Sequence, residues 1–204
     1  CRVDAKKKTV GAKERDVVER LLFSDLAQTL EARRVVVVDE SGTHLDMTSA
    51  YARAPRGERA VDSALRNYGR NLSLIAALRL RGMDAPFVVE GSVNTAVFET
   101  YTEQILAPTL QPGDIVLIDN LSCHKTDTVR HLIEARGASI LFLPAYSPDL
   151  SPIEQAFSKL KQFLRRVKAL TFDALLDAIA DALLTISPVD AIDFFTDCGF
   201  LNLH

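Results

Sequence analysis

The chain has 204 residues, of which 48% are hydrophobic and 25% are charged, a composition typical of a globular protein with one well-buried core. No apolar run approaches the roughly 18 residues that a membrane span needs, and the first residues lack the apolar segment of a signal peptide. The sparse cysteines Cys1, Cys123 and Cys198 form no C-x-x-C motif, which argues against a zinc site and favours reduced thiols in the cytoplasm. Because residue 1 is Cys rather than Met, we expect a piece of a longer protein.

The net charge of −3 argues against a protein that coats nucleic acid, but the charges are unevenly distributed. Residues 51–82 hold seven arginines against two acidic residues, and residues 159–168 hold five basic residues and no acidic one. Residues 171–204 hold six aspartates and neither Lys nor Arg. A basic middle with an acidic tail allows a polyanion to dock on one face, although charge runs are more often simply solvated faces.

Hydrophobic periodicity and turn residues predict the elements in chain order. The first half is predicted to contain an amphipathic helix (13–31), a buried strand (35–39) and its hairpin partner (44–51). A loop or edge (53–70), two strands (72–80 and 86–90) and a helix (95–106) follow. The second half is predicted to contain a strand (115–119), a helix (126–136), a strand (139–143) and a loop with several prolines (144–152). Three helices follow, at 152–167, about 172–185 and 188–196. This order predicts an α/β fold in which helices pack on a mixed sheet.

Two aspartates stand at the ends of predicted buried strands. Asp39 follows four valines, and Asp119 ends a second strand. Ligands of α/β sheets gather at the carboxyl ends of strands, but a turn aspartate is the alternative for each. Because side chains alternate along a strand, only one of Asp39 and Glu40 can share a site with Asp119, and we expect Glu40 to point away.

Glu154 opens the helix predicted over 152–167. It lies at the edge of the apolar stripe of this helix, where it can reach over the sheet. The alternative is a capping box, with Ser151 at the N-cap and Glu154 at N3. Asp149 is a nearby rival that stands in a loop between two prolines.

Three carboxylates on rigid elements are suited to holding two hard divalent cations for phosphoryl transfer. Residues 118–125, Ile-Asp-Asn-Leu-Ser-Cys-His-Lys, and residues 146–154, Tyr-Ser-Pro-Asp-Leu-Ser-Pro-Ile-Glu, extend the pattern, and 34 residues separate Asp119 from Glu154. In these features the chain resembles the DDE transposases of the mariner-like superfamily, in their bacterial insertion-sequence branch. The resemblance covers roughly residues 34–166.

The resemblance implies an RNase H-like mixed β-sheet flanked by helices, with a C-terminal helical extension. It divides the chain into a linker helix region (1–34), a DDE catalytic domain (35–167) and C-terminal acidic helices (168–204). It assigns Asp39, Asp119 and Glu154 as catalytic residues and as ligands of two Mg²⁺ (or Mn²⁺) ions. The implied activity is DNA cleavage followed by strand transfer, with double-stranded transposon ends and target DNA as partners. A homodimer acting in the bacterial cytoplasm, at the nucleoid, is also implied.

Basic residues near this site are predicted to contact the DNA backbone, a task that needs no sequence recognition. These are Arg53, Arg56, Arg59, His124, Lys125, Lys159, Lys161 and Arg165. For His124 and Lys125, capping of the following helix is the alternative. A shallow groove is expected, since the implied substrate is a duplex. Two other functions compete: an RNase H-like nuclease without transposition, and a catalytically inactive DNA-binding remnant.

Overall fold

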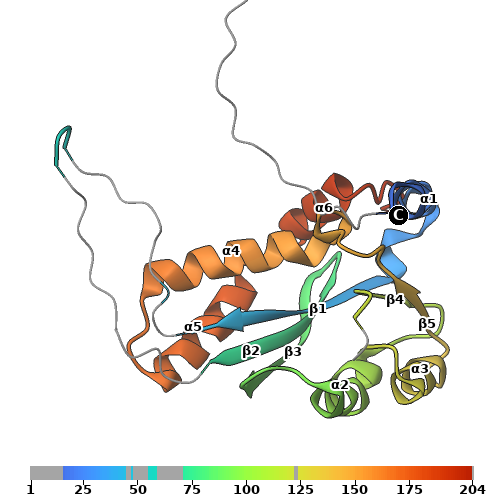
Figure 1. The fold of residues 1–204 in the computed structure, drawn as a ribbon, viewed down its shortest axis with the longest axis horizontal. Coiled ribbons are helices and arrows are strands. Elements are labelled where there is room, and N and C mark those ends of the chain that lie inside the picture. Colours follow the sequence, from blue (N-terminus) through green and yellow to red (C-terminus); the bar gives the residue numbers. More distant parts are fainter. Residues whose placement is uncertain (1–15, 45–46, 48–54, 59–70, 122–123, 204) are drawn as a thin grey trace, which may run out of the picture.

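A computed structural model describes residues 16–44, 47, 55–58, 71–121 and 124–203. Its centre is a five-stranded mixed sheet with the order β3-β2-β1-β4-β5 (Figure 1). The strands are β1 (Val35–Thr43), β2 (Leu72–Arg79), β3 (Gly82–Glu90), β4 (Ile115–Ile118) and β5 (Ser139–Phe142). β1, β2 and β3 pair in antiparallel fashion, whereas β4 is parallel to both β1 and β5. The predicted mixed sheet is confirmed.

Helices cover both faces of this sheet (Figure 1). They are α1 (Val17–Thr29), α2 (Thr95–Tyr101), α3 (Asp127–Glu134), α4 (Pro152–Val167), α5 (Phe172–Leu184) and α6 (Pro188–Asp197). Helix α4 crosses one face, and α5 and α6 pack with it in the same core, whereas α2 and α3 pack on the other face. The predicted C-terminal helices are thus present, while the division at residues 34 and 167 stays a prediction.

Strict alternation in β1 divides the core into two halves. Val35 and Val37 belong to the core on the α4 face, and Val36 and Val38 belong to the core on the α2 and α3 face. All four valines are almost completely buried, as expected for a strand covered on both faces. This alternation fixes the face on which each following polar side chain of β1 lies.

The predicted hairpin partner of the first strand is wrong. Ser41 and Gly42 do not form a turn, because β1 continues through them to Thr43 and pairs with β2. Ser41 is itself buried, opposite Leu74. Of the segment assigned to that hairpin, residues 45–46 and 48–51 lie outside the described residues.

Helix α1 begins after Asp16, whose carboxylate accepts hydrogen bonds from the N–H groups of Val18 and Glu19. Its buried side chains are Phe23 and Ala27. The predicted amphipathic helix does not bury its larger apolar side chains, since Val17, Val18, Leu21, Leu22 and Leu26 are exposed. The helix therefore contacts the core through the side that carries Phe23 and Ala27, and not through the side with the most apolar residues.

The remaining predicted elements that fall within the described residues are confirmed, with shifts at their ends, whereas most of the loop or edge predicted at 53–70 lies outside them. Helix α2 continues through a π-helical turn (Thr102–Leu106) and a 3-10 turn (Ala107–Thr109), and a further 3-10 turn at Pro148–Leu150 interrupts the loop before α4. Helix α4 has the predicted bounds. Among the helices of the described residues, none combines the length and apolar character required to cross a membrane.

Candidate active site

Asp39 and Asp119 lie side by side at the carboxyl ends of two parallel strands. In the parallel pairing of β1 with β4, Val38 is opposite Ile118, so the aspartate that follows each residue occupies an equivalent position. Asp39 continues the Val35 and Val37 series and therefore faces α4. Both aspartates line one cavity, as predicted for side chains on a common face.

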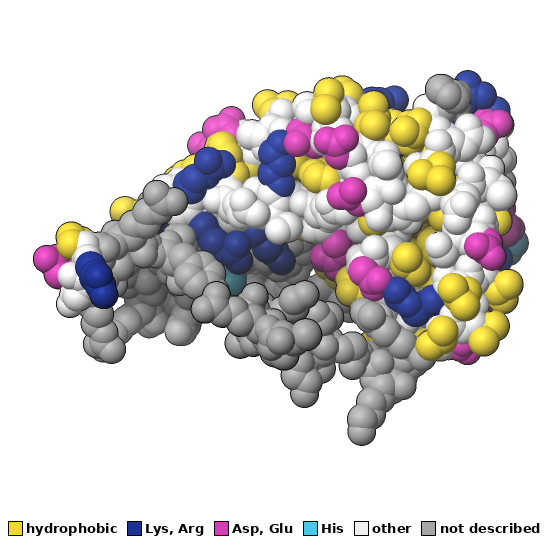
Figure 2. All heavy atoms as spheres, turned by 90° about the horizontal axis from the view of Figure 1, so that it is seen from above, with side chains coloured by type: hydrophobic (Ala, Val, Ile, Leu, Met, Phe, Trp, Pro, Cys, Tyr) yellow, Lys and Arg dark blue, Asp and Glu magenta, His cyan; other side chains and the backbone are white. Residues whose placement is uncertain are grey.

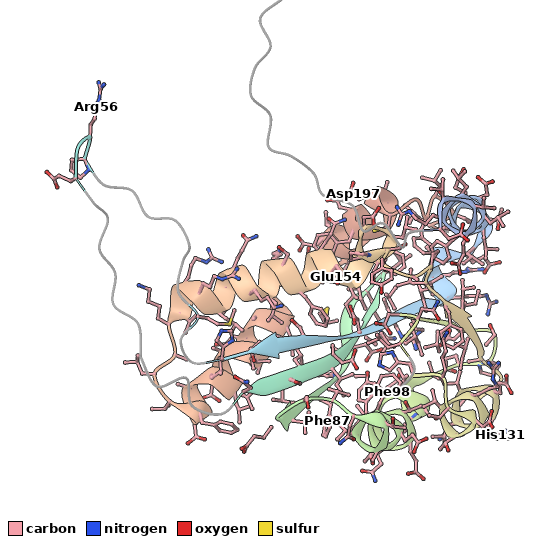
Figure 3. The ribbon with its side chains drawn as sticks, in the orientation of Figure 1. Arg56, Phe87, Phe98, His131, Glu154 and Asp197 are labelled. Carbon is pink, nitrogen blue, oxygen red and sulfur yellow. The ribbon has the colours of Figure 1, made fainter. Side chains whose placement is uncertain are left out.

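Glu154 completes the lining of this cavity from the first turn of α4, where Figure 3 shows it above the sheet. The cavity holds about 380 Å³ and also has apolar walls, including Leu143, Pro144 and Tyr146. It is therefore a pocket with an apolar wall rather than the shallow groove expected from the sequence. Its three carboxylates come from β1, from the residue that directly follows β4, and from α4, and all three elements are anchored in the core.

The capping-box alternative for Glu154 is wrong in this structure. Ser151 occupies the N-cap position, but its side chain makes no capping hydrogen bond. The Ser151 hydroxyl is buried and has no hydrogen-bond partner among the described residues. Since Glu154 is exposed and lines the pocket, its carboxylate is available for a ligand.

The loop that leads into α4 is braced from two sides. The guanidinium of Arg20 in α1 donates two hydrogen bonds to the carboxylate of Asp149, at 2.6 and 3.2 Å. The thiol of Cys198, which is free and buried, lies 3.6 Å from the backbone oxygen of Asp149. Asp149 is thus engaged in holding the loop and does not line the pocket, which separates it from its rival Glu154.

Tyr146 occupies an unusual position in the same loop. Its φ of 55° lies in the left-handed region, which a bulky residue rarely adopts, and its side chain is 60% exposed beside the pocket. Ser147 is buried next to it and donates a hydrogen bond of 3.1 Å to the carbonyl of Ala145. The backbone at the pocket rim is therefore held in a strained form, as is common near functional sites.

The pKa of Asp39 is raised by its burial and by the negative charges beside it. Burial, together with the charges of Glu154, Glu40 and Asp119, raises the pKa of Asp39 to about 7, although a hydrogen bond from the N–H of Glu40 opposes this. Hard oxygen donors around one pocket form a donor set that suits Mg²⁺ or Mn²⁺. Within the described part of the chain, no three such side chains already stand together as a metal cluster. We therefore expect cations to draw the carboxylates together against their mutual repulsion.

The raised pKa of Asp39 predicts a stability that depends on pH. Because the folded state holds this proton more tightly than the unfolded state, the contribution of Asp39 to stability is fully present at low pH and is lost as the pH rises from about 4 through 7. In the absence of metal at pH 8, Asp39→Asn is therefore expected to stabilise the protein, by up to on the order of 4 kcal/mol. Urea unfolding at pH 5 and pH 8 measures this, with the exposed Asp193→Asn on α6 as the matched control. A variant less stable than the wild type at pH 8 would contradict the electrostatic origin of the shift.

Glu40 and His124 form a second layer behind the carboxylates that the sequence did not reveal. Glu40 does not line the pocket, which agrees with the expectation that it points away. It nevertheless contacts the site through His124, whose ring lies between Glu40 and Asp119. The His124 ring is fully buried and both of its nitrogens are engaged, so it does not make the phosphate contact expected from the sequence. The five-residue spacing from Asp119 to His124 was the available signal.

The other residues predicted to bind DNA differ in their exposure, in their contacts and in their distance from the pocket. Lys125 is exposed, with its ammonium 5.3 Å from the centre of the Phe142 ring. Lys159 forms an ion pair of 2.6 Å with Asp190, which joins α4 to α6. On α4, Lys161 and Arg165 are partly exposed one turn apart, and Figure 2 shows basic side chains gathered over the half of this face that holds the C-terminal part of α4. Arg56 lies on the turn at residues 55–58, away from Glu154 (Figure 3), while Arg53 and Arg59 lie outside the described residues.

This combination of fold and site is typical of RNase H-like catalytic domains, in which carboxylates gather at the carboxyl ends of strands in a mixed sheet. A family model described as DDE superfamily endonuclease matches residues 34–176. The chain therefore belongs to the DDE superfamily endonucleases. No match was found among curated proteins.

Solved structures of Mos1 transposase share this fold. The Mos1 strand transfer complex has a TM-score of 0.77 at 18% identity, covering 97% of this chain and 63% of that chain. The pre-cleavage Mos1 transpososome has a TM-score of 0.76 at 16% identity, covering 100% and 68%. The Mos1 catalytic domain with Raltegravir and Mg has a TM-score of 0.68 at 16% identity, covering 89% and 88%. The RNase H-like fold is thereby confirmed, and the chain spans 64% of the Mos1 chain in its paired-end complex with the left transposon end.

Proposed function

We propose that the chain is the catalytic domain of a transposase, which cleaves DNA phosphodiesters and then transfers the freed strand end to target DNA. The observation that carries this proposal is the convergence of Asp39, Asp119 and Glu154 on one pocket of a DDE superfamily endonuclease. Support also comes from structures that share the fold, namely Mos1 paired-end complexes with the left transposon end, with Mn and with Mg. In the same proposal the partner is double-stranded DNA, the active form is a homodimer, and the source is a bacterial insertion sequence acting in the cytoplasm at the nucleoid.

The side chains divide the chemical work. Asp39, Asp119 and Glu154 would hold two Mg²⁺ or Mn²⁺ ions, which when bound activate the attacking water and offset the charge that develops in the in-line displacement. The rigid strand ends hold the two aspartates in place, and the buried stripe of α4 holds Glu154. The apolar wall at Leu143 and Pro144 excludes water from one side of the pocket and leaves the carboxylate side for the phosphodiester.

The basic side chains of α4 are proposed to hold the DNA backbone beside this pocket. Lys161 and Arg165 stand at i and i+4 and so project from the same side of the helix. Lys125 follows the Asp119 segment and is exposed. Lys159 remains in the proposal, although its pair with Asp190 already gives it a structural contact. Contacts of this kind fix the register of a duplex without reading its sequence.

The test of the proposed function is strand transfer. Duplex DNA carrying the sequences that border the gene on each side is incubated with the protein, Mg²⁺ and a labelled target plasmid. Cleavage together with joining to the plasmid supports the transposase. Cleavage without joining identifies a nuclease without transposition, and DNA binding with neither reaction identifies an inactive DNA-binding remnant.

Metal dependence is the second expectation. Nicking is expected with Mg²⁺ or Mn²⁺ and not with Ca²⁺, because the looser coordination geometry of Ca²⁺ fits the in-line reaction poorly. Mn²⁺ is also expected to raise the thermal unfolding temperature, since it binds the folded carboxylates and removes their repulsion. Differential scanning fluorimetry with Mn²⁺ checks the binding, and a gel assay checks the nicking. Full nicking in excess chelator would contradict a two-metal reaction.

A further inference from the structure

His124 lies between the carboxylate of Glu40 in β1 and that of Asp119, which directly follows β4. Its Nδ1 is 2.5 Å from Oδ1 of Asp119, and its Nε2 is 2.8 Å from Oε1 of Glu40. The side chain of His124 has no exposed surface, and its ring packs against Phe98 of α2 with 4.1 Å between the ring centres. The imidazole is thus held on its edges by acceptors and on its face by an aromatic ring.

The chemistry of these contacts fixes the form of the ring. A carboxylate only accepts hydrogen bonds, so two carboxylates can both be satisfied only when both ring nitrogens carry a proton. The ring is therefore an imidazolium that offsets one of the two negative charges beside it. Removing it would leave Asp119 and Glu40 as uncompensated acids near Asp39.

The same contacts restrict the orientation of the Asp119 carboxylate. Oδ1 of Asp119 also accepts a hydrogen bond of 3.1 Å from the N–H of Leu121. Both hydrogen bonds end on one oxygen, Oδ1, and they arrive from the segment that follows β4. The plane of the carboxylate is thereby fixed, which leaves Oδ2 for a ligand in the pocket that Asp119 lines.

We propose that His124, backed by Glu40, is a positioning residue that holds Asp119 in the orientation needed to bind a divalent cation. The inference rests on the proposed function, and it assigns to Glu40 and His124 a part in it that the sequence did not suggest. Residues that orient a metal ligand from behind typically affect metal affinity or activity about 10–100-fold when they are changed. A purely structural ion triad would instead affect only the stability of the fold.

Two substitutions at His124 separate positioning from stability. The amide nitrogen of Asn takes approximately the place of Nδ1, so His124→Asn keeps a donor to Asp119 and loses the contact with Glu40. The amide of Gln takes approximately the place of Nε2, so His124→Gln keeps the contact with Glu40 and loses the donor to Asp119. The exposed His131 of α3, replaced in the same two ways, provides the matched controls.

The experiment measures Mn²⁺ affinity by electron paramagnetic resonance, the unfolding temperature, and the rate of Mg²⁺-dependent nicking for each variant. His124→Gln is expected to weaken Mn²⁺ binding and nicking about 10–100-fold, whereas His124→Asn stays within about fivefold of the wild type. Both are expected to lose similar stability, since each breaks one of the two contacts. Should His124→Gln fail to fold, His124→Ala replaces it, because it also removes the donor to Asp119, and the same loss of Mn²⁺ affinity of about 10–100-fold is expected.

The outcomes are distinct. Equal losses of Mn²⁺ affinity in the Asn and Gln variants, in proportion to lost stability, would overturn the positioning assignment. Wild-type Mn²⁺ affinity in His124→Gln, or in His124→Ala where that replaces it, would overturn it as well. A wild-type protein that neither binds Mn²⁺ nor nicks DNA would overturn the proposed function and the positioning assignment with it.

Discussion

Replacing Asp119 by Asn is expected to reduce DNA cleavage by a factor on the order of 10²–10³ or more, the loss seen when one preorganised electrostatic contact to a reacting group is removed. The change removes a negative charge from the pocket and leaves the shape of the side chain intact. The Oδ1 atom of Asn still accepts hydrogen bonds from His124 and from the N–H of Leu121, so the segment after β4 keeps its anchors. DNA affinity is expected to stay the same or rise slightly, because one charge that repels phosphate is gone.

Fluorescence anisotropy with labelled duplex DNA measures the affinity, and a gel assay measures cleavage by the same preparation. Asp193→Asn on α6, an exposed aspartate away from the pocket lining, is the control that removes the same charge elsewhere. Loss of binding and folding in parallel with cleavage would identify Asp119 as a structural aspartate, and retained cleavage would remove it from the metal site.

Periodicity predicted the mixed sheet and the placement of the carboxylates, whereas the RNase H-like fold and the catalytic assignment followed from the family resemblance. Four valines before Asp39 required a strand buried on both faces, and a strand of that kind fixes the direction of the residue that follows it. The apolar stripe of α4 placed Glu154 at the edge of the core for the same reason. These inferences succeeded because each depends on a pattern within one element.

Contacts between elements were not predictable in this way. Glu40 and His124 are 84 positions apart and meet only because β1 and the segment after β4 are neighbours. The pair of Lys159 with Asp190 likewise joins two helices, and the charge run on α4 does not show which of its members is already neutralised. Ser41 and Gly42 resemble a turn in composition, yet the pairing of β1 with β2 carries the strand through them.

Replacing Glu154 by Gln is expected to reduce cleavage by a similar factor, on the order of 10²–10³. The stability of the fold is expected to change little. The reason is that Glu154 takes no part in a capping box in this structure. The negative charge of Glu154 stabilises the helix slightly, because it lies near the positive N-terminal end of the helix dipole. The same charge repels Asp39 and helps to raise the pKa of that carboxyl. The two effects oppose each other, so the free energy of unfolding should change by no more than about 0.5 kcal/mol.

Ser151→Ala is the matched test of the same helix end. Removing a serine N-cap usually costs about 1 kcal/mol, but the buried Ser151 hydroxyl has no partner among the described residues. Its replacement is therefore expected to be neutral or stabilising, since it removes a buried polar group that is not hydrogen-bonded. Urea unfolding of both variants, together with the cleavage assay, decides between the two assignments. A destabilised Ser151→Ala together with an active Glu154→Gln would support the capping box and would remove Glu154 from the metal ligands. A stable and inactive Glu154→Gln would instead assign the glutamate to the chemistry.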